Sequence, residues 1–182
     1  MLPLVVGTLT CLLIAALAQL SGQVLAKKEG ILEVTKPSDR EIVLTRTFAA
    51  ARQTVFDALT QANHIVHWMK PTIMPLVSCE VDLRAGGSFR YVFQRPRGAK
   101  IEVRGAYLTV DPPQRWVYTE TYDFSPLKVL ITTALDQVGS ETVFKRTMMY
   151  SSKQERDDDF EGVASSATEV YANLERYLGS SR

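Results

Sequence analysis

Residues 152–179 have the sequence SKQERDDDFEGVASSATEVYANLERYLG, which predicts one long helix. Ser152 and Glu155 have the spacing of a capping box, and Gly179 is a suitable C-terminal stop. A helix over 153–178 would be about 38 Å long, which is enough to cross a whole sheet. Its apolar residues repeat at three- and four-residue steps, as on one buried face: Phe160, Val163, Ala164, Ala167, Val170, Tyr171, Leu174 and Leu178.

Upstream of this helix, the sequence alternates with the two-residue period of strands. Turn-forming Gly, Pro, Asp and Ser residues divide it into six predicted strands, at about 75–83, 87–95, 100–110, 114–122, 127–136 and 141–150. The connections are too short for helical crossovers, so these strands should be antiparallel.

The residues before these strands predict one more strand and two short helices. Residues 40–48 alternate and are rich in β-formers, which indicates a first strand. Apolar spacing predicts a helix at about 51–60, and a second at about 62–69 ends before Pro71. This order predicts an α+β fold, with a curved seven-stranded antiparallel sheet around the long C-terminal helix. We expect a cavity between sheet and helix to be the functional site.

Composition places the chain in the globular class. Of its 182 residues, 46% are hydrophobic and 23% are charged, which excludes disordered and collagen-like chains. We expect one domain at 39–178, with a linker at 27–38 before it and a tail at 179–182 after it. The 21 basic and 20 acidic residues give a net charge of +1, so nothing indicates nucleic-acid binding.

Residues 1–26 form an apolar leader without any Lys, Arg, Asp or Glu. A signal peptide cleaved after Ala26 fits this composition, and the protein would then be exported. A reversed signal anchor fits the position of Lys27 and Lys28 after the apolar run, and residues 2–20 would then contact a membrane. A start codon assigned too far upstream is the third interpretation, under which the protein is cytoplasmic. The sequence leaves all three open.

Several motifs, in order along residues 39–178, are shared with one protein superfamily. The sequence resembles the START-like (SRPBCC) superfamily, and is most similar to the bacterial branch related to the C-terminal domain of the 90-kDa heat-shock chaperone's ATPase activator. One difference lies early in the final helix, where many relatives have Gly-Trp and this chain has Gly162-Val163. The motifs that carry the resemblance are Arg46-x-Phe48-x-Ala50, VFDALT at 55–60, HW at 67–68, DLRAGGSFRY at 82–91 and GAYLTVDPPQR at 105–115.

The resemblance implies a helix-grip fold and a cavity for a hydrophobic ligand. It does not imply one activity, because members include lipid carriers, hormone receptors, cyclases and co-chaperone domains. Our first hypothesis is a binding protein for an apolar or amphipathic small molecule, without evident catalysis. The alternatives are a pocket enzyme of the polyketide-cyclase type, with Glu120 or Tyr118 as acid or base, and a chaperone-associated module with a chaperone partner.

Strand parity and the apolar face of the long helix indicate which residues should line the cavity. Each of these side chains could instead simply fill a core, since apolar strand faces are buried by default. The resemblance is what favours a lined cavity. The expected ligand-binding residues are Trp68, Phe89, Tyr91, Phe93, Val103, Tyr107, Trp116, Tyr118, Glu120, Phe144, Arg146, Met148, Val163, Ala167 and Val170.

Glu120 and Arg146 each lie on an otherwise apolar strand face, where an unpaired charge is costly. The two strands that carry them should flank a third strand, about 9–10 Å apart, a gap that long side chains can bridge. The two residues could therefore pair with each other or bind the polar group of a ligand. A bulge that turns either residue toward water is the remaining alternative.

We expect no catalytic residue, metal site or cofactor. His64 and His67 are three residues apart, but no third ligand is apparent, so a surface helix with two histidines is the preferred interpretation. Gly86 and Gly87 lie between predicted strands and indicate a turn, not a phosphate-binding loop.

Overall fold

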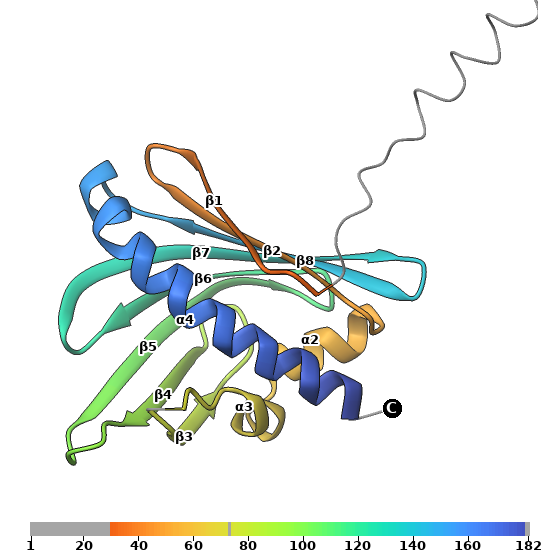
Figure 1. The fold of residues 1–182 in the computed structure, drawn as a ribbon, viewed down its shortest axis with the longest axis horizontal. Helices are drawn as coiled ribbons and strands as arrows, with labels where there is room; N and C mark the ends of the chain where they lie inside the picture. Colours follow the sequence, from red (N-terminus) through yellow and green to blue (C-terminus); the bar gives the residue numbers. More distant parts are fainter. Residues whose placement is uncertain (1–29, 73, 181–182) are drawn as a thin grey trace, which may run out of the picture.

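The final helix, α4 (Lys153–Ser180), lies across one face of a single sheet in the computed structural model (Figure 1). The structure describes residues 30–72 and 74–180. The Ser152 hydroxyl accepts a hydrogen bond from the N–H of Glu155 at 3.2 Å, and the Glu155 carboxylate accepts one from the N–H of Ser151 at 3.1 Å. These bonds satisfy backbone donors at the start of α4. The predicted helix is confirmed.

The sheet has eight strands in the order β1-β2-β8-β7-β6-β5-β4-β3, and every neighbouring pair is antiparallel. The seven predicted strands are confirmed to within a few residues. The strands are β1 (Glu33–Ser38), β2 (Glu41–Phe48), β3 (Leu76–Val81), β4 (Ser88–Gln94), β5 (Lys100–Asp111), β6 (Arg115–Tyr122), β7 (Ser125–Val138) and β8 (Glu141–Met149).

The sheet has one strand more than predicted, because β1 lies in the segment 27–38 that we expected to be a linker. β1 is an edge strand and nearly all of its residues are exposed. Its sequence, EVTKPS, therefore has no alternating apolar face, and it contains Pro37, which is tolerated at a sheet edge. β1 is joined to α4 by a polar contact, because the Arg156 guanidinium donates to the carbonyl of Ser38 at 2.7 Å.

Two short helices, α2 (Arg52–Thr60) and α3 (Ala62–Trp68), connect β2 to β3 and contact α4 (Figure 1). Both match the helices expected from the sequence. Trp68 is buried, and its indole N–H donates to the carbonyl of Ala58 at 2.8 Å, which joins α3 to α2. The pair closes one end of the space between the sheet and α4.

A β-bulge interrupts the pairing of β5 with β6. Tyr107 pairs with Tyr118 and Thr109 pairs with Val117, so Leu108 is an additional residue in β5. Bulges bend a strand and increase its twist. The sheet accordingly curves around α4, as Figure 1 shows.

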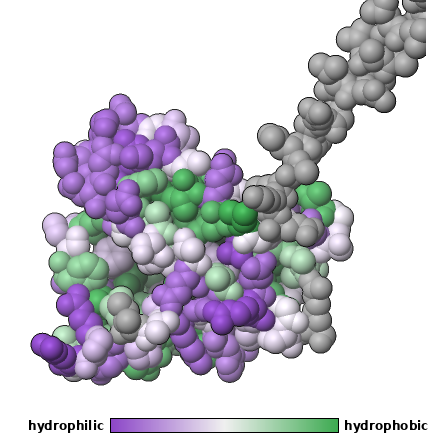
Figure 2. Space-filling view, viewed as in Figure 1, coloured by the Kyte–Doolittle hydropathy of each residue, from purple (hydrophilic) through white to green (hydrophobic). Residues whose placement is uncertain are grey.

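The surface is hydrophilic at the end where β1 turns into β2 and α4 begins (Figure 2). Within residues 30–72 and 74–180, no helix has both the length and the apolar composition needed to cross a membrane. The leader at 1–26 lies outside the described residues, so its three interpretations stay predictions.

Candidate functional site

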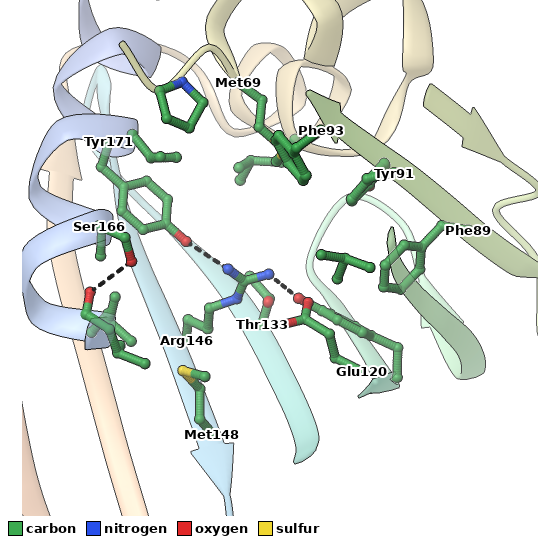
Figure 3. Close-up of a pocket in the computed structure, with 18 of the residues that line it drawn as sticks. Met69, Phe89, Tyr91, Phe93, Glu120, Thr133, Arg146, Met148, Ser166 and Tyr171 are labelled. Atoms are coloured by element: carbon green, nitrogen blue, oxygen red, sulfur yellow. Dashed lines mark hydrogen bonds between the residues drawn. The ribbon is translucent and has the colours of Figure 1, made fainter. Parts of the chain in front are cut away.

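A cavity of about 360 Å³ lies between the curved sheet and α4. Figure 3 shows side chains from both layers pointing into it. Most of its lining is aromatic or aliphatic, and every residue expected to bind the ligand lies in that lining; their role in binding stays a prediction. These residues are Trp68, Phe89, Tyr91, Phe93, Val103, Tyr107, Trp116, Tyr118, Glu120, Phe144, Arg146, Met148, Val163, Ala167 and Val170.

The cavity lining also includes residues that the sequence analysis did not select. Tyr122 and Tyr171 could have been found, because Tyr122 shares strand parity with Glu120 and Tyr171 lies on the apolar face of α4. The residues between α3 and β3 could not, because a connection without regular structure has no periodicity to reveal its orientation. The additional lining residues are Leu44, Leu59, Met69, Pro71, Met74, Ile101, Tyr122, Phe124, Thr133, Ser166 and Tyr171.

Arg146 of β8 places a guanidinium inside this lining (Figure 3). Its Nη1 donates to the hydroxyl of Tyr171 on α4 at 3.0 Å, and its Nη2 donates to the hydroxyl of Tyr118 on β6. The guanidinium also lies 5.6 Å from the centre of the Tyr118 ring, within range of a cation–π interaction. Sheet and helix thus hold the cation from two sides.

Glu120 also lines the cavity, but it does not pair with Arg146. Its carboxylate accepts a hydrogen bond from the hydroxyl of Tyr122. The registers explain the separation: Glu120 lies opposite Val129 and Arg146 lies opposite Thr133 on the intervening β7. This offset along β7 is about 13 Å. Direct pairing of the two charges, one of the three alternatives considered from the sequence, is therefore wrong, as is a bulge that turns either one away from the cavity.

The phenols around Arg146 do not neutralise its charge. Burial raises the pKa of Tyr118 and the pKa of Tyr171 above the usual value, so both hydroxyls remain protonated at neutral pH. The guanidinium donates its hydrogen bonds to two neutral hydroxyl oxygens. The guanidinium of Arg146 therefore keeps its full positive charge, and its two phenol partners are neutral.

The connection between α3 and β3 is fastened to α4 beside the cavity. Glu169 Oε1 accepts hydrogen bonds from the backbone N–H of Thr72 at 2.8 Å and from its hydroxyl at 2.5 Å. The side-chain amide of Asn173 donates to the carbonyl of Lys70 at 3.2 Å. The cavity lining includes three residues of this connection: Met69, Pro71 and Met74.

Replacing Glu169 with alanine should speed hydrogen exchange at the Thr72 amide by about fivefold, because that amide loses its acceptor. The hydrogen bonds from Thr72 lower the pKa of Glu169. The contact is therefore complete at neutral pH and is lost as the pH falls through this lowered pKa. Glu161→Ala, which removes an exposed carboxylate earlier on α4, is the matched control. An unchanged exchange rate of the Thr72 amide in Glu169→Ala would show that Glu169 does not hold this connection.

The two histidines lie away from any metal-like cluster. His64 Nδ1 lies 2.6 Å from the hydroxyl of Tyr177, and the His67 ring stacks on the Tyr177 ring with centres 5.8 Å apart. Among the residues that the structure describes, no group of three or more His, Cys, Asp or Glu side chains could hold a metal ion. Burial raises the pKa of the Cys79 thiol to about 11, so it is protonated at neutral pH.

Comparison with known proteins assigns the family. The family model described as Activator of Hsp90 ATPase homolog 1-like protein matches residues 49–179, which extend from the residues before α2 to the end of α4. No curated protein matches the chain.

Solved structures show the same fold. A protein of Rhodobacter sphaeroides is 25% identical with a TM-score of 0.78, over 82% of this chain and 98% of its own. A protein of Staphylococcus epidermidis is 26% identical with a TM-score of 0.68, over 82% of this chain and 94% of its own. A protein of Mycobacterium smegmatis, 17% identical with a TM-score of 0.75, covers 84% of this chain and shares the fold. The chain therefore belongs to the family of Activator of Hsp90 ATPase homolog 1-like proteins, which have a START-type helix-grip fold.

Proposed function

We propose that the protein binds an apolar or amphipathic small molecule in the cavity between the sheet and α4. The observation that carries this proposal is the cavity itself, whose volume of about 360 Å³ and largely apolar lining are those of small-molecule sites. Arg146 and Glu120 supply the few polar groups that such sites use to orient a ligand. The family supports the proposal, because its fold commonly encloses hydrophobic ligands.

Tyr118, one of the two acid–base candidates for catalysis of the polyketide-cyclase type, does not fit the role of a base. Such an enzyme needs a side chain that exchanges a proton near its working pH. Burial raises the pKa of Tyr118, so its phenol does not act as a base at neutral pH. A role beside a chaperone has the family description as its only support.

The direct test is native mass spectrometry of the full chain purified from its own host. We expect a protein–ligand complex with a discrete mass difference that disappears on denaturation. Intrinsic fluorescence supplies a second readout, because the two tryptophans of the chain, Trp68 and Trp116, both line the cavity. Failure to retain any small molecule, together with unchanged fluorescence across apolar probes, would overturn the proposal.

Val163→Trp should fill the cavity from α4 and weaken ligand retention by about tenfold or more, equivalent to about 1.4 kcal/mol. Val163 is part-buried and lines the cavity, whereas Ser165, two residues later, is exposed and does not. Ser165→Trp is therefore the matched control and should retain the ligand. Native mass spectrometry compares the bound fractions, and equal retention by both variants would place the ligand elsewhere.

A further inference from the structure

We infer that the ligand of this cavity carries a carboxylate, and that Arg146 is the residue that binds it. The inference rests on the proposed binding function and names the chemical class of its ligand. It comes from the charge and the unused hydrogen-bond donors around one side chain (Figure 3).

Arg146 has no ion-pair partner among the residues that the structure describes. Within residues 30–72 and 74–180, no carboxylate lies within 4.0 Å of its guanidinium nitrogens, whereas other arginines on the same sheet, such as Arg46 and Arg90, have acidic partners. Holding a charge partly out of water without a direct ion-pair partner is unfavourable, and folded proteins rarely retain one unless it has a role. An anionic ligand would supply the missing charge.

The donors around Arg146 exceed the acceptors. Two of the five guanidinium N–H groups donate to the Tyr118 and Tyr171 hydroxyls, and the buried Nε has no acceptor in the part of the chain that the structure describes. Each phenol oxygen accepts a hydrogen bond from Arg146 and still carries its own proton, which a ligand acceptor could receive as a hydrogen bond. Thr133, opposite Arg146 on β7, has a buried hydroxyl that likewise finds no partner in the described segments. Around Arg146, the N–H and O–H donors thus outnumber the acceptors that the described residues supply.

A carboxylate matches these donors better than a phosphate does. One guanidinium supplies one positive charge, and its planar donors match the two oxygens of a carboxylate. The Glu120 carboxylate lines the same cavity and would repel a phosphate dianion more strongly than a monoanion. The apolar remainder of the lining would contact the ligand's hydrocarbon body.

The test is a titration of the full chain with dodecanoate, 1-dodecanol and dodecyl phosphate, followed by tryptophan fluorescence. We expect dodecanoate to bind about 10- to 100-fold more tightly than 1-dodecanol, since a hydrogen-bonded charge accounts for such a factor. Arg146→Met should remove this preference, so that the variant binds dodecanoate no more tightly than 1-dodecanol. Arg97→Gln, an exposed arginine in the β4–β5 turn, is the control and should keep the preference.

A second variant keeps the inference testable if Arg146→Met does not fold, which thermal denaturation shows. Glu120→Gln removes the negative charge of the cavity lining, so it should tighten dodecanoate binding relative to 1-dodecanol binding. Equal affinities for dodecanoate and 1-dodecanol, a preference for dodecyl phosphate, or weaker dodecanoate binding by Glu120→Gln would each overturn the carboxylate assignment. The binding function itself survives in the first two cases, because the apolar probes still bind; it fails only if none of the three probes binds.

Discussion

Replacing Gly105 with alanine should lower the free energy of unfolding by about 3 kcal/mol. A Cβ at this position of β5 would lie 2.1 Å from Cε1 of Phe89 and 2.3 Å from the carbonyl oxygen of Thr119. Both distances are far shorter than van der Waals contact. The Thr119 oxygen belongs to the backbone of β6, which pairs with β5, so it cannot retreat without disturbing the sheet. Chemical denaturation of the wild-type and variant proteins measures the difference.

Gly162→Ala is the matched control for this substitution. Gly162 lies within α4, and nothing lies within 4 Å of a Cβ built there. Alanine at this helical position should raise the free energy of unfolding by about 0.5–1 kcal/mol, because glycine loses more conformational freedom on folding. A Gly105→Ala variant as stable as the wild type would contradict the tight packing of Phe89 against β5.

A substitution at Gly105 should also affect the cavity, because Phe89 contacts this glycine and lines the cavity. The ring of Phe89 lies against Gly105, and its centre is 5.6 Å from the Tyr107 ring and 5.4 Å from the Tyr118 ring. A side chain at 105 would displace Phe89 and so disturb its packing with these rings. Because Tyr118 accepts a hydrogen bond from Arg146, the displacement would reach the polar group of the cavity. Gly105 thus has a physical role both in the sheet and beside the cavity.

The order of elements could be predicted from the sequence because most elements have one apolar face. The residues of α4 repeat at three and four positions, and the strands from β3 to β8 alternate between short turns. β1 lacked that signal, since an exposed edge strand buries little of either face. Its place depends instead on pairing with β2 and on the contact between Arg156 and Ser38, and neither can be derived from periodicity.

Strand parity also placed the cavity residues, but it could not settle how the two charges relate. Parity puts Glu120 and Arg146 on the same face of the sheet, and the structure agrees. Their separation depends on the register of β6 and β8 against β7, which is set by turn lengths and bulges. Likewise, the contact between Arg146 and Tyr171 joins a strand to a helix, and only the packing of α4 on the sheet determines it.

Phe144→Ala should lower the free energy of unfolding by about 3–5 kcal/mol. The side chain is 1% exposed, and its ring centre lies 6.1 Å from that of Phe48 and 4.9 Å from that of Tyr171. It therefore joins β8 to both β2 and α4, and its removal leaves a void between sheet and helix. Leu130→Ala is the control: Leu130 is 39% exposed on β7, so its truncation should cost less than about 1 kcal/mol.

This loss of stability should also change the site, because Phe144 lines the cavity and contacts Tyr171. Without the ring, Tyr171 loses a neighbour that holds its hydroxyl toward Arg146, and the cavity becomes larger. An apolar ligand that fills the added space would restore part of the lost stability, since binding to the folded state alone stabilises it. Thermal denaturation with and without 1-dodecanol measures this effect. A larger ligand-induced shift in Phe144→Ala than in the wild type is the expected result, and equal shifts would show that the new space does not join the cavity.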